Sequence, residues 1–337
     1  MARTALATVG LVLLAAASAL ALDIGDPAPP LSVKKWVNGA PVSLESAKGK
    51  VLVVEFWATW CQPCRQTIPH MNRLHKKYGD KDVIFAGITE EDEATAKKYM
   101  ETMAMDYHVG LDDGSKTNAA YMKQVPGIPH AFVVDKEGRV AWHGHPLGRM
   151  ARVVEELVAG KFDTARAKKL SALQEKLAAT ARTRDPKRIH EVLDETIREA
   201  PDDPDAYRFK RALLRDEGKA EEAWPVLLAM AKGCAKDPDV LIEAAIILST
   251  ADDLAHRDLP KAMEFAKQAA ELSDAKAFGA LAALARVHYE LGHVALAAES
   301  AAKAAAAAEG DDRKRLEAHA AFYRSELERR RKDPDAK

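Results

Sequence analysis

The sequence predicts two folded parts, an α/β domain over residues 22–160 and an all-α domain of helical repeats over residues 161–337. Three observations lead to this prediction. The length of 337 residues is too great for one ordinary domain. Apolar, strand-like runs alternate with helical stretches as far as Gly160 and then stop. Beyond that point the chain is rich in alanine and is helical in pattern throughout.

Residues 1–21 are typical of a secretory signal peptide. Arg3 precedes an apolar run from Ala5 to Leu22, and small residues lead up to Ala21. We therefore expect cleavage near Ala21 and an exported, periplasmic protein whose cysteine pairs can be oxidised. The run also reaches the length of about 20 residues that an uncleaved membrane anchor needs, and this alternative stays open. No cysteine follows the run, which argues against a lipoprotein anchor.

The elements of the α/β domain are expected in the following order. Short strands at Leu31–Val33 and Val42–Leu44 flank Asn38-Gly39 and predict a small hairpin. Val51–Ala58 is a nearly continuous apolar run, as expected for a strand buried on both faces. Then follow a helix at about 62–78, a strand at 83–88, a helix at 94–105, a strand at 108–111, a helix at 115–123, strands at 131–134 and 139–142, and a helix at about 147–159. This order predicts a sheet with helices on both faces.

Helix pairs repeat in the C-terminal part. Residues of one unit are matched 74 positions later by residues of another, namely Tyr207, Leu214, Gly218, Ala223 and Leu227 by Leu281, His288, Gly292, Ala297 and Ala301. A further unit begins at Leu241, 34 residues after Tyr207, and this spacing is similar to that of tetratricopeptide repeats. A non-repeating bundle is the alternative, because alanine-rich sequence imitates the pattern. We expect a first helix pair over 173–200 and a charged capping helix over 313–331.

The composition excludes some functions and points to one site. Lys and Arg number 50 against 51 Asp and Glu, so no overall charge recruits nucleic acid, and we expect no nucleic-acid partner. Three cysteines are too few for a disulfide scaffold. Two of them, Cys61 and Cys64, form a C-x-x-C pair between a predicted buried strand and a predicted helix.

That position suits thiol chemistry. The free N–H groups and the positive end of a helix dipole stabilise a thiolate, and only a thiolate attacks a disulfide. Cys61 is therefore the candidate nucleophile. Cys64, expected one turn inside the helix, can resolve the mixed disulfide by internal attack and leave a Cys61–Cys64 disulfide. Pro63 suits the first helical turn because no donor is needed there.

Other interpretations of the histidines and cysteines are weaker. A zinc site needs four ligands, and the remaining cysteine, Cys234, lies far away in the helical part, where a small buried residue is the simplest interpretation. A purely structural disulfide is unusual across so short a loop. His143 and His145 lack a carboxylate or cysteine nearby in sequence and are weak evidence for a metal. We expect neither a metal nor a cofactor.

The segment from Glu55 to Arg65, EFWATWCQPCR, and the later Val125–Pro129, VPGIP, resemble the thioredoxin superfamily, most closely the extracytoplasmic TlpA/ResA-like thiol-disulfide oxidoreductases. The resemblance covers about Asp23 to Gly160. It implies a thioredoxin-like fold with a central mixed sheet and flanking helices. It also implies that Pro129 is a cis-proline opposite the cysteines, against the alternative of an ordinary trans turn proline.

The resemblance assigns further roles. Trp60, Ile128, Pro129 and His130 would bind substrate, and Trp57 belongs to the core. Glu55 would be a buried acid whose raised pKa lets it take the proton of the resolving cysteine, although it is also compatible with a tolerated buried polar residue. His130 stands where thioredoxins commonly carry threonine. A cationic His130 would lower the pKa of the nearby thiol, and an exposed bystander is the alternative.

The sequence thus predicts an exported thiol-disulfide oxidoreductase that acts on cysteine-containing protein substrates. It implies an upstream membrane or soluble thiol-disulfide partner, and a protein partner for the repeat surface. Direction, reductase or oxidase, cannot be inferred from the motif. One alternative is a binding or scaffold protein with an accessory redox domain. Another is a peroxidase of the same superfamily, but Thr59 precedes Cys61 at the wrong spacing for that.

Overall fold

A computed structural model describes residues 22–251, 256–273 and 278–332. The predicted signal peptide lies outside these residues. Contacts within the chain divide it after Lys168 into two compact units. The boundary predicted after Gly160 lies slightly earlier, and the domain limits stay a prediction. None of the described helices is both long and apolar enough to cross a membrane.

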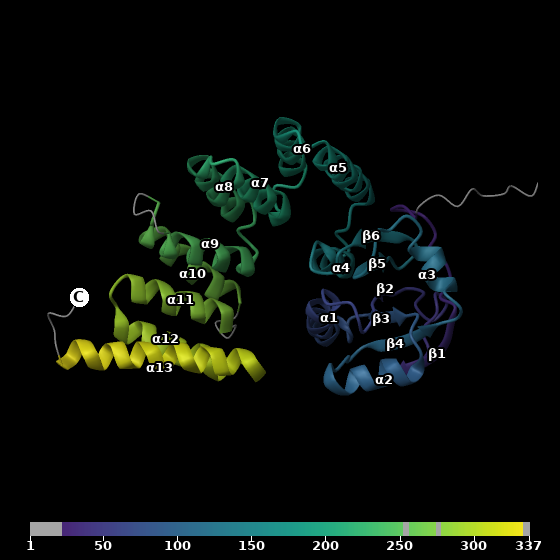
Figure 1. Cartoon of the computed structure of the whole chain (residues 1–337), viewed down its shortest axis with the longest axis horizontal. Coiled ribbons are helices and arrows are strands. Elements are labelled where there is room, and N and C mark those ends of the chain that lie inside the picture. The colour runs from purple at the N-terminus through teal and green to yellow at the C-terminus, as the bar shows by residue number, and fades with distance from the viewer. Residues whose placement is uncertain (1–21, 252–255, 274–277, 333–337) are drawn as a thin grey trace, which may run out of the picture. The chain divides into compact units, whose positions relative to one another are not determined.

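The first unit is built on a six-stranded mixed sheet with strand order β1-β4-β3-β2-β5-β6 (Figure 1). The strands are β1 Val33–Asn38, β2 Val51–Phe56, β3 Val83–Thr89, β4 His108–Asp112, β5 His130–Val134 and β6 Val140–Gly144. Strands β2, β3 and β4 pair in parallel, while β1, β5 and β6 join antiparallel. The helices are α1 Cys64–Tyr78, α2 Glu93–Thr102, α3 Lys116–Tyr121 and α4 Met150–Val158. The predicted thioredoxin-like α/β fold is confirmed.

Strand β2 lies at the centre because both of its faces are apolar. Val51 and Val53 belong to the core cluster that contains α1, whereas Leu52, Val54 and Phe56 belong to the cluster on the opposite face. This alternation is the period-two pattern of a strand. All six residues of β2 are buried, as the sequence predicted. Consequently the side chain at position 55 must point into the α1 face of the sheet.

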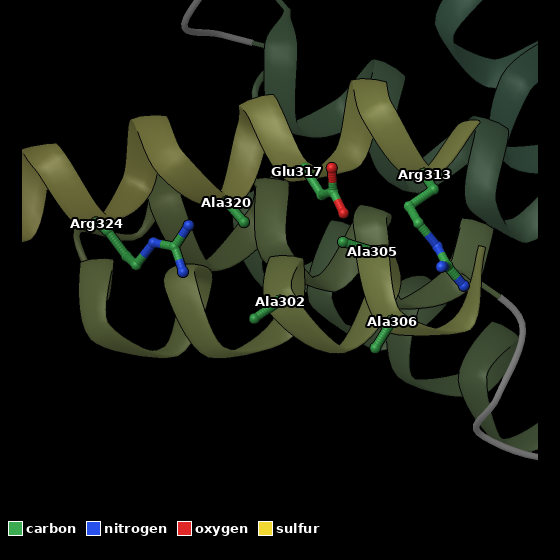
Figure 2. Close-up of a pocket in the computed structure, with 7 residues that line it drawn as sticks. All are labelled: Ala302, Ala305, Ala306, Arg313, Glu317, Ala320 and Arg324. Atoms are coloured by element: carbon green, nitrogen blue, oxygen red, sulfur yellow. The ribbon is translucent and has the colours of Figure 1, made fainter. Parts of the chain in front are cut away.

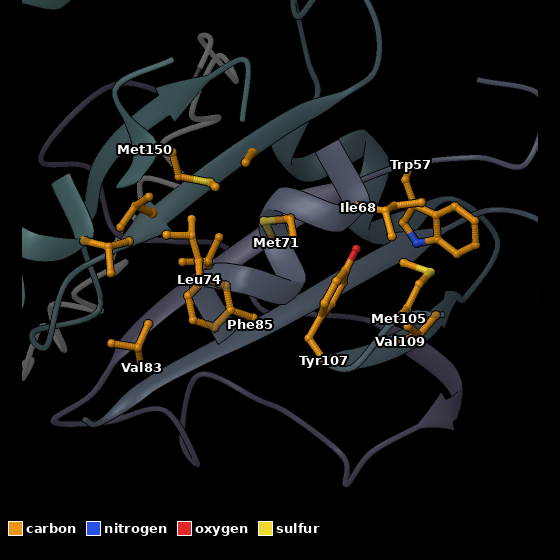
Figure 3. Close-up of a cluster of buried hydrophobic side chains, with 14 of the residues drawn as sticks. Trp57, Ile68, Met71, Leu74, Val83, Phe85, Met105, Tyr107, Val109 and Met150 are labelled. Atoms are coloured by element: carbon orange, nitrogen blue, oxygen red, sulfur yellow. The ribbon is translucent and has the colours of Figure 1, made fainter. Parts of the chain in front are cut away.

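Helix α1 covers that face with one apolar stripe. Ile68, Met71 and Leu74 recur at intervals of three residues and pack into the cluster with Phe85 of β3 (Figure 3). Met150 of α4 joins the same cluster. Burying such side chains stabilises a fold by about 1.5–3 kcal/mol each, so this stripe fixes α1 against the sheet.

The predicted N-terminal hairpin is wrong. Strand β1 pairs antiparallel with β4, far away in sequence, and residues 42–44 form no strand. Ser43 and Ser46 bond reciprocally instead, since each backbone N–H donates to the other's hydroxyl, at 2.9 and 3.1 Å. Such side-chain turns compete with a strand ladder. Val42 still faces inward, packed in the core cluster with β2.

The second unit is all-helical within the described residues (Figure 1). Its helices are α5 Thr164–Thr183, which begins before Lys168, and then α6 Pro186–Glu199, α7 Pro204–Asp216, α8 Ala220–Gly233, α9 Pro238–Thr250, α10 Leu259–Leu272, α11 Phe278–Glu290, α12 Val294–Ala307 and α13 Gly310–Lys332. Pairs α7/α8, α9/α10 and α11/α12 follow the predicted period. A helical repeat domain is consistent with this arrangement, and its identity as tetratricopeptide repeats stays a prediction.

Aspartate-proline steps start several of these helices. Asp203 and Asp237 are N-caps whose carboxylates accept hydrogen bonds from backbone N–H groups of the first turn. Pro204 and Pro238 follow at the first helical position, where proline needs no donor. The same arrangement at Asp185 separates α6 from α5, so the helix pair expected over 173–200 is present.

Gly233, at the end of α8, is a position where a methyl group cannot fit. An added Cβ would lie 2.0 Å from the carbonyl oxygen of Pro201. We expect Gly233→Ala to destabilise the protein by about 3 kcal/mol, because backbone must move. Urea unfolding followed by circular dichroism measures this. Gly279→Ala is the matched control, since its Cβ would meet only the Cδ1 atom of Ile242 at 3.4 Å. Equal unfolding midpoints for the two variants would contradict this account of Gly233.

Candidate active site

Cys61 and Cys64 form a disulfide at the point where the chain leaves β2 and enters α1. Both are buried. The sequence predicted that Cys64 lies one turn inside the helix. In the structure the helix begins at Cys64, with Pro63 as its N-cap. The backbone N–H of Cys64 donates to Sγ of Cys61 at 3.2 Å. Once the disulfide is reduced, this donor and the helix terminus stabilise a thiolate on Cys61.

Glu55 lies in the core beneath this pair. Its side chain is fully buried on the α1 face of β2. The hydroxyl of Thr67 donates to Oε1 at 2.7 Å, and the hydroxyl of Tyr107 donates to Oε2 at 3.0 Å. Burial raises the pKa of Glu55 from 4.5 to about 7, although both hydrogen bonds act to lower it. A carboxyl group with this pKa can hold or release a proton near neutral pH.

A glycine makes room for the Tyr107 bond. Gly87 on β3 is the register partner of Glu55 on β2. An added Cβ at Gly87 would lie 3.0 Å from the Tyr107 ring and 3.1 Å from Nε1 of Trp57. The missing side chain therefore lets both rings approach the strand beside Glu55.

Thr67 connects Glu55 to the resolving cysteine. Its Oγ1 lies 2.7 Å from Oε1 of Glu55 and 3.1 Å from the carbonyl oxygen of Cys64. One hydroxyl carries one proton. When Glu55 is ionised, Thr67 donates to it. When Glu55 is protonated, the carboxyl can donate to Thr67 and the hydroxyl can turn to the Cys64 carbonyl. The state of Glu55 is thus coupled to the backbone of Cys64.

The predicted substrate-binding residues lie around the same loop. The Ile128–Pro129 peptide bond is cis. His130, the next residue, pairs with Phe56 at the end of β2, just before the cysteine loop. Ile128 packs against the core cluster that includes Cys61 and Cys64. The structure therefore places the Pro129 segment beside the C-terminal end of β2, where the cysteine loop begins.

Trp60 and Trp57 separate as expected. Trp57 is in the core, while Trp60 is 74% exposed. Trp60 and Ile128 line a hollow of about 270 Å³, whose other walls include Thr89, Glu91 and Met122. This hollow is large enough for one substrate side chain, and it begins beside the cysteine loop.

Glu91 is a residue that sequence reasoning missed. One carboxylate oxygen accepts from the backbone N–H of Thr59 at 2.8 Å, and the other accepts from the Thr59 hydroxyl at 2.7 Å. These charge-assisted bonds hold the loop two residues before Cys61. The pair is 32 positions apart in sequence, so no local pattern indicates it.

Both predictions for His130 are wrong, because its side chain is neither cationic nor exposed. The ring is half-buried and lies with Nε2 3.2 Å from Nδ1 of His143. Burial, followed by the charges of His143 and His145, lowers the pKa of His130 to about 3. The imidazole is neutral at pH 7 and supplies no positive charge to the Cys61 thiolate.

Among the described residues, no group of three histidine, cysteine, aspartate or glutamate side chains could hold a metal ion. His143 stacks on Phe132. Cys234 is buried in the helical unit.

The first unit of the chain is similar to several known proteins. Residues 24–143 match the model of the AhpC/TSA family. The thiol-disulfide oxidoreductase ResA of Bacillus cereus is 35% identical over 120 residues, which are 35% of this chain and 68% of that protein. Protein FixW of Rhizobium leguminosarum is 30% identical over 156 residues, or 43% of this chain and 70% of that one. A solved thiol:disulfide interchange protein of the thioredoxin family from Chlorobium tepidum is 32% identical and covers 40% of this chain and 97% of its own, with a TM-score of 0.35.

Proposed function

Because this chain belongs to the TlpA/ResA-like thiol-disulfide oxidoreductases of the thioredoxin superfamily, we propose that it works outside the cytoplasm on cysteine pairs of protein substrates. The observation that carries the proposal is the Cys61–Cys64 disulfide at the start of α1, with a backbone donor on Sγ of Cys61. An apolar run before residue 22 supports export.

The first step is attack on a substrate disulfide. In the reduced enzyme the Cys61 thiolate forms a bond to one substrate sulfur, and the substrate S–S bond breaks. The other substrate sulfur leaves as a thiolate and takes a proton from water. The product is a mixed disulfide between Cys61 and the substrate. The hollow lined by Trp60 and Ile128 holds a side chain that neighbours the substrate cysteine.

The second step resolves the mixed disulfide. Cys64 must lose its proton before it attacks Sγ of Cys61, and its burial disfavours the thiolate. Ionised Glu55 is the buried base below the pair that accepts this proton, and its partner Thr67, which also contacts the carbonyl oxygen of Cys64, holds the carboxylate in place. The new Cys61–Cys64 bond releases the second substrate thiolate. The substrate gains two electrons and the enzyme pair loses them.

An upstream thiol-disulfide partner completes the cycle. If that partner is a dithiol, it reduces the Cys61–Cys64 disulfide and the enzyme acts as a reductase. If the partner removes electrons, the same two steps run backwards and oxidise substrates. The helical unit supplies a surface for a protein partner.

Redox titration of the purified protein, with alkylation of free thiols and mass spectrometry, tests the proposal together with insulin reduction. We expect Cys61 and Cys64 to interconvert reversibly between dithiol and disulfide in glutathione buffers, and we expect insulin to be reduced when dithiothreitol is the electron source. A pair that fails to cycle, or a protein without insulin reductase activity, would overturn the proposed enzymatic role.

A further inference from the structure

Arg211 and Arg215 lie on α7 of the helical unit. Other cations of this unit are paired with carboxylates, for example Arg208 with Asp205 and Glu243, Lys210 with Asp194, and Lys219 with Glu217. Within the described ranges neither Arg211 nor Arg215 forms an ion pair. Glu243 on α9 attracts Arg211, but its carboxylate is already bound by Arg208 at 2.8 Å.

Partial burial makes the charge of Arg211 costly, whereas Arg215 on the same helix is exposed. Arg211 is half-buried, and burial together with the positive charge of Arg215 lowers the pKa of Arg211. Two guanidinium groups four residues apart on one helix face repel each other. A partly buried charge without a counter-ion destabilises a fold, so an arrangement of this kind is expected where a ligand supplies the missing negative charge.

The two side chains face a hollow of about 360 Å³. Arg211 and Arg215 form one wall from α7, and Trp224 of α8 forms another. Ile247 and Thr250 close it from α9. We call this the arginine hollow. It combines two guanidinium groups with an apolar wall, which suits a carboxylate that has apolar groups next to it.

A second hollow adjoins it. This hollow measures about 390 Å³ and shares Thr250 with the arginine hollow. It is mainly apolar, and its rim includes Ile246 and Phe322, which are 40% and 50% exposed. A chain segment that places carboxylates in the arginine hollow can therefore place an apolar side chain next door. A small free anion would fill only part of this surface.

A hollow between α12 and α13 has a different lining. There Glu317 lies between Arg313 and Arg324 above a floor of alanines (Figure 2). No such residue lines the arginine hollow, whose described lining holds no acid.

We propose that the arginine hollow binds the carboxylates of an acidic segment in a protein partner, with an apolar residue of that segment in the adjoining hollow. This inference rests on the proposed role of the helical unit as a partner-binding surface. It names the chemistry of that partner: aspartate or glutamate side chains next to a leucine or phenylalanine, in an extended stretch.

The test uses the full chain and fluorescein-labelled decapeptides, measured by fluorescence anisotropy. One peptide carries aspartate and glutamate around a central leucine and phenylalanine, and a second carries asparagine and glutamine in their place. We expect the acidic peptide to bind, with affinity that falls as salt rises. We expect Arg211→Gln with Arg215→Gln to weaken it at least about 10-fold. Ile246→Ser should weaken binding of this peptide but not of its leucine- and phenylalanine-free analogue.

Arg313→Gln with Arg324→Gln is the matched control and should leave binding unchanged, with circular dichroism confirming that both double variants fold. Equal binding of the acidic and amide peptides, or unchanged binding by the Arg211/Arg215 variant, would overturn the inference. If inorganic phosphate displaces the labelled peptide as effectively as the unlabelled peptide does, the inference is also overturned and the hollow is a site for small anions. Insulin reduction, measured in parallel, separates the two proposals. If the peptide does not bind but insulin is reduced, only this inference fails. If the peptide binds but insulin is not reduced, only the enzymatic role fails.

Discussion

Replacing Cys61 with serine should abolish thiol-disulfide exchange, with insulin reduction falling by at least about 1,000-fold. A serine hydroxyl does not ionise near neutral pH and cannot replace the thiolate on which the Cys64 N–H acts. Compared with the reduced protein, which also lacks the Cys61–Cys64 bond, stability should change little, because serine is close to cysteine in size. The turbidity rate of reduced insulin measures the effect, and residual activity within about 10-fold of the unchanged protein would contradict the assignment of Cys61 as nucleophile.

Cys64→Ser is the companion variant with a different outcome. Attack by Cys61 remains possible, but the internal resolving thiol is gone. We expect a covalent mixed disulfide with a substrate to accumulate, visible as a species on a non-reducing gel that disappears on reduction. A trapped species with Cys61→Ser instead of Cys64→Ser would reverse the roles of the two cysteines.

Replacing Glu55 with glutamine should slow resolution by about 100-fold and remove the rise of the rate through pH 7. The unchanged protein should show that rise because Glu55, with a pKa of about 7, must be ionised to accept the Cys64 proton. Stopped-flow tryptophan fluorescence of single turnovers across pH 5–9 measures it. Thr67→Val is the matched variant: it keeps the carboxyl but removes a bond that lowers its pKa, so the rise should move above pH 7.

The same carboxyl should make stability depend on pH. In the folded protein the Glu55 pKa is about 7, and in the unfolded chain it is near 4.5. Between these values the unfolded chain loses its proton while the folded protein keeps it, so stability falls as pH rises from 4.5 to 7 and levels off above. The shift corresponds to about 3 kcal/mol. Urea unfolding should show this loss relative to Glu55→Gln. A pH-independent difference between the two proteins would contradict the raised pKa.

Much of the α/β unit could be predicted because its signals are local. The apolar run at Val51–Ala58 predicted a strand buried on both faces, and β2 is such a strand. The pairing of β1 could not be predicted, since its partner β4 lies far along the chain. Hairpin signals around Asn38 favoured a local partner, and the serine turn at 43–46 defeated it.

The candidate site divides in the same way. Cys61 and Cys64 form a C-x-x-C motif and Pro129 ends the VPGIP segment, so these residues could be identified from the sequence. Thr67, Tyr107 and Glu91 act through contacts with residues 12, 52 and 32 positions away, and no pattern marks them. The charge of His130 was misjudged because it depends on burial and on the neighbouring histidines rather than on the residue itself.

The helical unit was predicted as helices with a surface for a protein partner, but the arginine hollow itself was not predicted. Alanine content and the aspartate-proline steps indicate helix number and breaks from local chemistry. The arginine hollow depends on which cations find carboxylates after folding. Arg208 and Arg211 look alike in sequence, yet only Arg208 reaches Glu243. Which of two arginines forms an ion pair depends on packing and cannot be predicted before the fold is known.

The pH dependence of cysteine alkylation in the reduced protein tests the central claim most directly. Iodoacetamide labelling at a series of pH values, quantified by mass spectrometry of the two cysteines, reports the thiolate fraction of each. The account predicts that Cys61, whose thiolate accepts a hydrogen bond from the Cys64 N–H, reacts with a midpoint well below the ordinary thiol pKa of about 8.5, while Cys64 reacts far more slowly. A midpoint near 8.5 for Cys61, or faster labelling of Cys64, would contradict it.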